Sequence, residues 1–559
     1  MKVGIIPDEF NMTSVKSVFR ELEETLAQRH DIVRRPAEYT YASASKQRAM
    51  SEDFLRKSDV IIGRIDEELL QFREDIERRP PLIGFLMGEM SRGAGDMLKW
   101  VPYLKSTDVL VGNCSGDVEI TKKFLTNAQI RMLPFSFDEA TFQPVDEQRR
   151  KAIRAQMRFK DRDKILLYAG RISLEKNVHT LLRIFSVLQD LVPDLHLVIV
   201  GEPHAVQFQA MGVNPLSSAA TVMRLMNQLR VRKEQVHFIG SKSATELRDL
   251  YAMADLLVNL TLNHDENFGL AQVEALACGT PVVGTSWGGL KDTIKHGETG
   301  YQISTLVTDS GVKLNWWEAI NRLIALLEDE ETLVRLRQHC RAHALEIYSQ
   351  VHYAESLESI VVECERRSHG ACEPLKLTEF AREYWLECQP REFSPPSFQR
   401  GQKSFEMYKE LIAPYTGATE NNIALDEPFA PDQLVMLATP VRVEENVIKL
   451  DDPIFPLEFS IPEANRGIVE QTLEVLRKQP IISLKSLQES IPAPSLQTGL
   501  QWLLEKGIVL RTKVMDAYLE PDMIGEQMGQ SVFSIQPVDF ATDVIVIRQT
   551  GAAHSYAAT

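Results

Sequence analysis

The sequence predicts two doubly wound α/β domains in series, followed by a smaller α+β region. The chain has 559 residues, which exceeds one ordinary core and indicates two or three domains. Short apolar strands alternate with amphipathic helices over residues 1–145 and again over residues 164–305. Such alternation is typical of a parallel sheet with helices on both faces. After about residue 375 the alternation stops, which predicts a third region of different architecture.

The first domain is expected over residues 1–150 and is Rossmann-like. Its predicted strands are KVGIIP, DVIIG, PLIGFL, DVLVGN and IRMLPF, and its clearest helix is SVFRELEETLAQR. The charged stretch at residues 146–164, DEQRRKAIRAQMRFKDRDK, interrupts the apolar rhythm. We therefore expect a linker and a surface helix there.

The second domain is expected over residues 151–372. The predicted strands are KILLYAG, LHLVIVG, VHFIG, LLVNL and PVVGT, with the helices VHTLLRIFSVLQDL, TVMRLMNQLR and TELRDLYAMA among them. Long helices follow from residue 315 to about residue 370. We expect them to complete this domain and to cross back to the first one.

The C-terminal region is expected over residues 373–559. Its start is punctuated by proline in FSPPSFQRGQ and EPFAPDQ. Three amphipathic helices are predicted in NRGIVEQTLEVLRKQP, SLKSLQESI and PSLQTGLQWLLEKG, with a strand after Gly507, which fits a winged-helix-like unit. These helices can supply one another with a small core, so we expect a separate folding unit on which the first two domains do not depend.

Composition excludes several classes of function. There are 78 Asp and Glu against 62 Lys and Arg, a formal charge of −16, which disfavours nucleic acid or an anionic membrane as the main partner. The six cysteines show neither CxxC pairing nor zinc spacing, so we expect reduced thiols and no metal site. No window reaches the apolar length of a membrane span, and we expect a cytoplasmic protein without a transmembrane segment.

Two glutamates stand out in the stretch HDENFGLAQVEALACGTPVVG, residues 264–284. Apolar residues surround Glu274 on most of a helical circumference, and a buried carboxylate without partners costs several kcal/mol. Glu274 must therefore meet a ligand, a cation or a hydrogen-bond donor. Glu266 lies in the loop between a predicted strand and this helix, where ligands bind in open α/β sheets. Taken by itself, the pair is better explained by Glu274 as a satisfied core carboxylate and Glu266 as a solvated loop residue.

Four separated segments in this order resemble one known family. Glu266 and Glu274, with FG after the first and EALACGTPVVG after the second, look like the E-x7-E signature of the GT-B retaining glycosyltransferases of family 4 (glycosyl transferases group 1). WGGLKDTIKHGETGYQI, VHFIGSKSATELRDLYAMADLLVNL and YAGRISLEKNVHTLL resemble further segments of that family. The resemblance covers about residues 100–350. It implies a GT-B fold, in which two Rossmann-like domains face each other across a cleft.

The resemblance also implies roles for individual residues. Glu266 would contact the transferred sugar of a nucleotide-sugar donor, and Glu274 would accept hydrogen bonds from the ribose hydroxyls. Arg171 and Lys176 would grip the donor diphosphate and stabilise it as it leaves, with Glu266 completing the catalytic set. The remaining donor-binding positions would be Gly170, Gly240, Phe268, Gly269 and Leu270. No cofactor or metal is required if the cations and helix dipoles stabilise the leaving group.

The residues around Arg171 and Lys176 also suit an anion-binding site when the resemblance to the family is left aside. A predicted strand delivers Gly170 and Arg171 at its end, Lys176 follows, and Asn177 is a candidate N-cap for the next helix. Two cations beside a helix N-terminus suit a diphosphate, although a solvated loop would be the simpler interpretation of this pattern alone.

Other positions leave alternatives open. Gly288 and Gly289 would let the backbone approach the donor or simply form a turn. Asp292 matches an acidic family position or caps a following helix. His264 and His296 are taken as ordinary loop residues. Glu89 stands where the family often has an acceptor-side histidine, and the first strand lacks the usual Gly–Gly loop.

The predicted function is that of a retaining glycosyltransferase acting on an unidentified sugar, lipid, small-molecule or protein acceptor. One alternative is a GT-B phosphorylase or synthase acting on a glucan or a disaccharide. Another is a non-catalytic GT-B scaffold that recruits a protein partner through its C-terminal domain. DNA binding through the winged-helix-like unit is disfavoured, since the segment between Glu420 and Glu463 is acidic and carries no basic recognition face.

Overall fold

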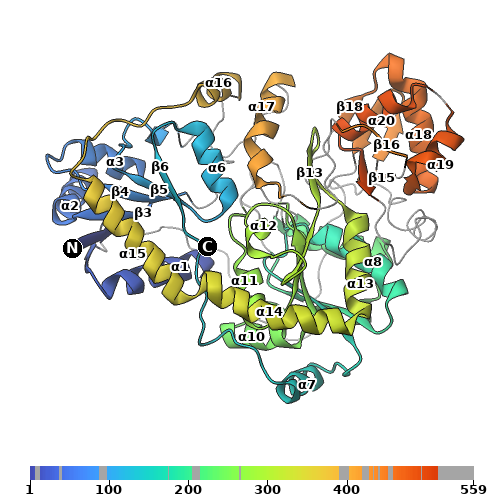
Figure 1. Ribbon diagram of the computed structural model, residues 1–559, viewed down its shortest axis with the longest axis horizontal. Helices are drawn as coiled ribbons and strands as arrows, with labels where there is room; N and C mark the ends of the chain where they lie inside the picture. The colour runs from blue at the N-terminus through green and yellow to red at the C-terminus, as the bar shows by residue number, and fades with distance from the viewer. Residues whose placement is uncertain are drawn as a thin grey trace.

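The protein contains two six-stranded parallel sheets and a smaller C-terminal domain, as seen in a computed structural model (Figure 1). The structure describes residues 1–6, 13–36, 39, 41–86, 97, 99–173, 176–203, 215–262, 266–388, 402–417, 419, 427–431, 433–438, 441–450, 458–492 and 494–513. The predicted doubly wound α/β architecture is confirmed.

The first sheet has the strand order β2-β1-β3-β4-β5-β6, and all of its strands are parallel. The strands are β1 (Lys2–Ile5), β2 (Asp31–Arg34), β3 (Val60–Arg64), β4 (Leu82–Phe85), β5 (Val109–Gly112) and β6 (Gln129–Met132). Strands β3, β4 and β5 are buried, which explains their continuous apolar runs. The surrounding helices include α1 (Thr13–Ala27), α2 (Ala44–Lys57), α3 (Glu67–Glu74) and α6 (Ser115–Phe124).

The second sheet has the order β12-β11-β10-β7-β8-β9, again with every strand parallel. Its strands are β7 (Lys164–Ala169), β8 (Leu195–Val200), β9 (Val236–Phe238), β10 (Leu256–Asn259), β11 (Val282–Thr285) and β12 (Gly300–Ile303). The helices include α7 (Glu147–Gln156), α8 (Val178–Leu191), α9 (Pro215–Gln228), α10 (Ala244–Met253), α11 (Leu270–Ala277) and α12 (Leu290–Thr293).

Three long helices then return the chain to the first domain. They are α13 (Trp316–Glu328), α14 (Glu330–Tyr348) and α15 (Gln350–Arg367), and Figure 1 shows α14 and α15 running across the front of both domains. The buried face of α15, including Leu357 and Val361, packs with Val3, Ile62 and Ile83 of the first sheet. The expected crossing is therefore present.

The C-terminal part contains α16 (Glu379–Cys388), α17 (Gln402–Ile412) and the 3-10 turn η5 (Ala413–Tyr415) before its own small domain. That domain comprises β15 (Gln433–Leu437), β16 (Val441–Glu444), β17 (Val447–Leu450), β18 (Glu458–Ser460), α18 (Arg466–Lys478), β19 (Ile481–Ser483), α19 (Leu484–Ser490), α20 (Leu496–Glu505) and β20 (Val509–Lys513). The three helices and the strand that the sequence predicts here are observed as α18, α19, α20 and β20. Strand β15 pairs between β19 and β20, a feature that the local pattern does not reveal.

The C-terminal third shares buried cores with the first two domains. Tyr384, Leu411 and Tyr415 belong to the same buried cluster as Phe124 of α6 and Trp287 of the second domain. Leu434, Met436, Ile481 and Leu510 belong to the buried core around Trp316 and α8. The Trp316 indole Nε1 donates a hydrogen bond to the Leu437 carbonyl, 2.6 Å away. The independence of the C-terminal unit and the boundaries at residues 150 and 372 stay predictions, and these shared cores lead us to expect that the first two domains depend on the C-terminal third.

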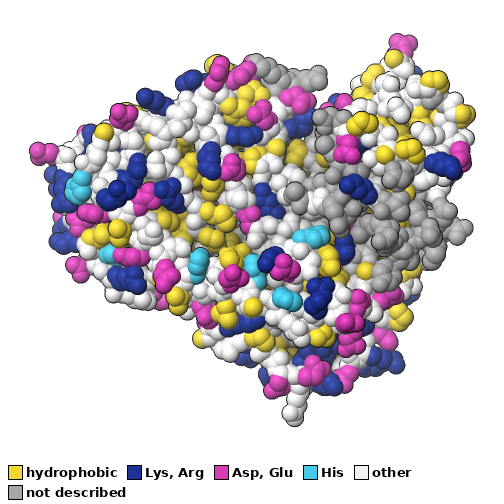
Figure 2. All heavy atoms as spheres, in the orientation of Figure 1, with side chains coloured by type: hydrophobic (Ala, Val, Ile, Leu, Met, Phe, Trp, Pro, Cys, Tyr) yellow, Lys and Arg dark blue, Asp and Glu magenta, His cyan; other side chains and the backbone are white. Residues whose placement is uncertain are grey.

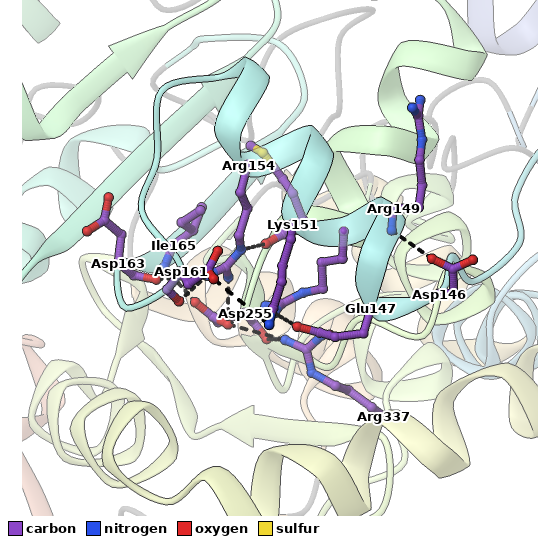
Figure 3. A network of polar contacts seen from close by, with 12 residues as sticks. Asp146, Glu147, Arg149, Lys151, Arg154, Asp161, Asp163, Ile165, Asp255 and Arg337 are labelled. Carbon is purple, nitrogen blue, oxygen red and sulfur yellow. Dashed lines mark hydrogen bonds and ion pairs between the residues drawn. The ribbon is translucent and has the colours of Figure 1, made fainter.

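A buried ion-pair network fixes α7 and α14 to the amino edge of the second sheet (Figure 3). One carboxylate oxygen of Asp255 accepts hydrogen bonds from Arg150 (2.7 Å) and Arg154 (2.9 Å), and Arg337 lies 3.3 Å from the same oxygen. The other oxygen accepts from the backbone N–H of Ile165 at 2.8 Å. Burial and the neighbouring guanidinium of Arg150 lower the pKa of Arg337 to about 10. The network secures the edge opposite to the one where ligands bind in such sheets.

Two findings on the described residues concern the cysteines and possible membrane spans. Five described cysteines, namely Cys114, Cys278, Cys340, Cys364 and Cys372, carry free thiols. In the part of the chain that the structure describes, no helix combines the length and the apolar character needed to cross a membrane. On the face seen in Figure 2, Lys and Arg side chains alternate with Asp and Glu over most of the coloured surface.

Candidate active site

Two charged residues meet at the carboxyl edge of the second sheet. Lys176 follows β7, just before α8 begins at Val178, and Glu266 follows β10, just before α11 begins at Leu270. Strands β7 and β10 are neighbours, so their following loops converge. The Lys176 ammonium forms an ion pair with Glu266 Oε2.

The Lys176–Glu266 pair is largely shielded from water. Glu266 is only 8% exposed. Burying the carboxylate alone would be costly, and the lysine offsets that cost. The two residues are 90 positions apart in sequence, yet the structure brings both predicted groups together. A compact cation–carboxylate pair at this edge can take up both an anionic and a hydroxyl-bearing ligand group.

Glu274 lies on α11, whereas Glu266 lies in the loop that precedes this helix. The Glu274 side chain is partly buried. The Tyr251 hydroxyl from α10 donates a 2.8 Å hydrogen bond to Glu274 Oε2. Desolvation raises the pKa of Glu274 to about 7, although the tyrosine bond opposes that shift. The sequence indicated that Glu274 needs a partner, and in the protein alone that partner is Tyr251.

We expect the stability of the protein to fall as the pH rises through the pKa of Glu274. Its folded pKa, about 7, lies above the ordinary value of 4.5, so the stabilisation is fully present below pH 4.5 and is lost as the pH rises through 7. The loss should be about 1–3 kcal/mol in the free energy of unfolding. Urea unfolding at pH 5 and pH 8 measures it. In Glu274→Gln this part of the pH dependence should disappear, and parallel curves for the two proteins would contradict the assignment.

The N-terminus of α11 shows which atoms are available to a ligand. The Phe268 ring is 3% exposed and packs edge-on against Phe135 (5.3 Å) and Tyr348 (5.6 Å). The side chain of Phe268 therefore belongs to the core, so only its backbone can face a donor. Gly269 adopts φ 93°, a left-handed conformation that favours glycine, at the N-cap of α11. Leu270 is partly buried against the same core.

The other predicted donor residues lie along the same edge of the sheet. Arg171 follows Gly170 at the end of β7, and its carbonyl accepts a 2.7 Å hydrogen bond from the Tyr168 hydroxyl. Gly240 follows β9, and its carbonyl accepts from the Gly201 N–H at 3.0 Å. The structure thus places Arg171, Lys176, Glu266 and Gly240 beyond the carboxyl ends of three strands.

The glycine pair after β11 packs against the Glu266 loop. A Cβ added to Gly288 would lie 2.2 Å from the Glu266 carbonyl oxygen, and one added to Gly289 would lie 2.3 Å from the Phe268 nitrogen. The Gly289 N–H donates to the Glu266 carbonyl at 2.6 Å. Glycine is therefore required here because two backbone segments touch, and the turn helps to set the position of Glu266.

Asp292 has a role that neither sequence interpretation anticipated. It lies inside α12, so it does not cap that helix. Instead its carboxylate accepts hydrogen bonds from the Ser115 N–H (2.6 Å) and the Ser115 hydroxyl (2.8 Å) at the start of α6 in the first domain. Asn267 reaches the same domain through a 3.3 Å contact with Asn113. The two domains are therefore bridged beside the site, by pairs about 150 residues or more apart that no local pattern reveals.

Asn177 and His296 each contact a neighbouring backbone group. Asn177 occupies the N-cap position of α8 but makes no side-chain cap bond. Its amide donates instead to the Leu260 carbonyl at 2.8 Å, which ties α8 to the end of β10. The His296 ring contacts the Gln302 N–H at 3.2 Å, a structural role. His264 and Glu89 lie outside the described residues.

Across the described ranges, no group of three or more His, Cys, Asp or Glu side chains could hold a metal ion. Metal-independent chemistry stays a prediction.

Comparison with known proteins gives the same assignment for the second domain. The family model "Glycosyl transferases group 1" matches residues 149–343. A D-inositol 3-phosphate glycosyltransferase of Corynebacterium jeikeium is 27% identical over 269 residues, covering 47% of this chain and 59% of the relative. A mannosylfructose-phosphate synthase of Agrobacterium fabrum is 34% identical over 189 residues, covering 32% and 38%. The chain thus spans little more than half of the first relative and less of the second.

Solved structures support the fold across both α/β domains. The Anabaena protein HepE in complex with UDP-glucose superposes with a TM-score of 0.50 at 15% identity, covering 65% of this chain and 99% of that protein. At this identity the likeness shows the fold alone. The chain therefore has a GT-B fold, and its residues 149–343 match the family model of the glycosyl transferases group 1.

Proposed function

We propose that the protein is a retaining glycosyltransferase of the family 4 type, which moves a sugar from a nucleotide-sugar donor to an acceptor. The observation that carries this proposal is the buried ion pair between Lys176 and Glu266 at the carboxyl edge of the second sheet. The resemblance of the sequence motifs implies a role in donor binding for both residues. They lie in the segment that matches the glycosyl transferases group 1 model.

Each charged group then has a separate task when the donor binds. Arg171 and Lys176 donate charge-assisted hydrogen bonds to the diphosphate. As Lys176 turns to the phosphates, the Glu266 carboxylate becomes free to accept hydrogen bonds from the hydroxyls of the transferred sugar. Glu274 accepts from the ribose hydroxyls, and the backbone near Gly240 lies beside the base.

The transfer proceeds on one face of the sugar. The bond between the anomeric carbon and the diphosphate oxygen breaks, and the acceptor oxygen bonds to the same face. The leaving phosphate oxygen takes the acceptor proton, so that atoms and charges balance. Arg171 and Lys176 stabilise the negative charge that develops on the diphosphate, which is the role a metal plays in other transferases. Glu266 orients the sugar rather than attacking it.

Arg171→Ala and Lys176→Ala should each weaken binding of the nucleoside diphosphate. Losing one charge-assisted contact costs about 1.5 to 3 kcal/mol, which is on the order of tenfold or more in Kd. Isothermal titration calorimetry measures the change. Lys295→Ala is the matched control, because Lys295 is an exposed lysine of the same domain paired only with Glu298 in the described contacts. Unchanged affinity in both variants would move the donor site elsewhere.

The function itself is tested by a thermal-shift screen against UDP-, GDP- and ADP-sugars, followed by assay of donor consumption. A ligand that binds only the folded state raises the melting temperature. A shift with one donor class, followed by metal-independent release of its nucleoside diphosphate, supports the proposal. Phosphate-dependent breakdown of an α-linked disaccharide would instead indicate a phosphorylase. Binding without any turnover would indicate a scaffold.

The acceptor belongs to the same proposal. A sugar, lipid, small-molecule or protein acceptor would reach the site from the first domain, and a protein partner could bind the C-terminal domain. Cytoplasmic localisation is proposed on the reduced cysteines.

A further inference from the structure

We infer that Tyr415, a residue of the C-terminal third, is a positioning residue for the active site: it holds the Gly288–Gly289 turn, and through that turn the Glu266 loop, against the first domain. This inference deepens the proposed function and rests on it for the catalytic consequence. The structural part stands on contacts in the protein alone. Tyr415 closes η5, directly after α17, and is completely buried.

Tyr415 bonds to both α/β domains. Its hydroxyl donates a 2.6 Å hydrogen bond to Asp117 Oδ1, on α6 of the first domain. Its carbonyl accepts a 2.9 Å hydrogen bond from the Gly288 N–H, in the second domain. The Tyr415 ring lies 5.7 Å from the ring of Trp287, centroid to centroid. The side chain and the carbonyl of Tyr415 therefore join the first domain to the second.

The segment around Tyr415 is fitted closely to both surfaces. A Cβ added to Gly116 of α6 would lie 2.3 Å from the Tyr415 ring, so this glycine makes room for the tyrosine. The Gly417 N–H donates to the Ser286 carbonyl at 2.9 Å. A Cβ added to Gly417 would lie 2.1 Å from the Ser286 hydroxyl oxygen. We call residues 413–417 the strap, because they pass between the two domains and bond to each.

The strap is anchored at its other end. The Lys409 ammonium, on α17, forms a 2.8 Å ion pair with Asp309, which follows β13 (Thr305–Thr308) at the tip of a hairpin with β14 (Gly311–Leu314). Asp309 also pairs with Lys506 of the C-terminal domain at 2.5 Å. The three charged groups are mostly buried, so the contact is worth more than a solvated surface pair. Figure 1 shows α17 standing between α6 and β13.

A short series of contacts leads from the strap to the predicted catalytic carboxylate. Tyr415 accepts from Gly288, and Gly289 donates to the Glu266 carbonyl at 2.6 Å. The Glu266 side chain then meets Lys176. Because transfer requires reacting groups to be placed within fractions of an ångström, a looser turn should slow the chemical step while leaving diphosphate binding intact.

The test is Tyr415→Phe, which keeps the ring and its packing and removes only the hydroxyl bond to Asp117. We expect kcat to fall about tenfold while the Kd for the nucleoside diphosphate stays within about twofold of wild type. Amide hydrogen exchange over residues 284–292 and 266–270 should become at least about threefold faster. Circular dichroism confirms that the variant is folded.

Two further variants sharpen the result. Asp117→Ala removes the acceptor from the other domain, and the double variant should be no worse than the more affected single variant if both act through one bond. Tyr384→Phe is the matched control, since Tyr384 is a buried tyrosine of the same third of the chain whose ring packs on Phe124 of α6 and Phe380 of α16. It should leave both kcat and exchange unchanged.

Several outcomes would overturn the inference. If amide hydrogen exchange in Tyr415→Phe is as slow as in the wild-type protein, Tyr415 does not hold the glycine turn. That result refutes the inference whatever happens to activity. An equal fall in kcat and in diphosphate affinity would mean that Tyr415 supports the whole donor domain rather than the Glu266 loop. Faster amide exchange with an unchanged kcat would show that loosening the turn does not slow the chemical step. That result would refute the positioning role. A wild-type protein that transfers no sugar would refute the proposed function instead. The exchange result would then test only whether Tyr415 holds the glycine turn.

Discussion

Glu266→Gln is expected to lower sugar transfer about 100-fold, the size of effect seen when one preorganised group is removed from a transition-state site. The substitution is nearly isosteric, so the loop should keep its shape. What it removes is the carboxylate charge that pairs with Lys176 and that, in the proposed mechanism, orients the transferred sugar. In the proposed mechanism the diphosphate contacts come from Arg171 and Lys176, so the Kd for the nucleoside diphosphate should change by less than about threefold. Steady-state kinetics and calorimetry on the same preparation measure both quantities.

The control for this experiment is Glu298→Gln, an exposed carboxylate of the same domain that pairs with Lys295. It should transfer sugar at the wild-type rate. A Glu266→Gln rate within a factor of about two of wild type, roughly 0.4 kcal/mol in barrier, would show that the assigned role is wrong. The double variant Lys176→Ala/Glu266→Gln adds a check, because it removes both charges together. If the two residues act as a unit, its loss should be smaller than the product of the single losses.

Ending the chain at Cys372 should abolish the folded state, in contrast to what the sequence alone suggests. The residues removed include Tyr384, Leu411 and Tyr415, which belong to the buried cluster that contains Phe124 of α6 and Trp287. They also include the strands whose residues pack in the core around Trp316. Burying one such side chain contributes about 1.5–3 kcal/mol. The whole stability of a domain is about 5–15 kcal/mol, so the loss of several is decisive. Soluble yield and the thermal unfolding transition measure the effect.

A chain ending at Lys513 is the matched control for this truncation, because it keeps every described element. It should be soluble and should bind the nucleoside diphosphate. A chain ending at Cys372 that is soluble and binds nucleotide as tightly as the full chain would show that the packing of the C-terminal third contributes little to stability.

Much of the architecture was predictable because the signals are local. The helix α8 coincides with the predicted VHTLLRIFSVLQDL, since its apolar residues recur at helical spacing. Strands β7, β8, β10 and β11 were recognisable as continuous apolar runs, which is what burial on both faces of a parallel sheet requires. Strand β2 was not foreseen, because DIVR is short and only partly buried at the edge of its sheet.

The sequence by itself also predicted which residues the second domain would offer to a ligand. The positions of Glu266 and Lys176 after strands are local features that favour the carboxyl edge of the sheet, and the resemblance of the motifs supplied the roles of Glu266, Glu274 and Lys176. The need of Glu274 for a partner followed from the apolar helix around it. That Phe268 turns into the core did not follow, because its neighbours Phe135 and Tyr348 are remote in sequence.

Only the tertiary structure decided how the parts depend on one another. The bonds of Asp292 to Ser115 and of Tyr415 to Asp117 join residues 177 and 298 positions apart. A hydrogen bond between such distant residues leaves no periodicity and no turn signature in either segment, since each side chain is chosen by a surface that forms only when the chain has folded. For the same reason the amphipathic helices of the C-terminal third suggested a self-sufficient unit: a local pattern shows that an apolar face needs a partner, and only the packed structure shows which one.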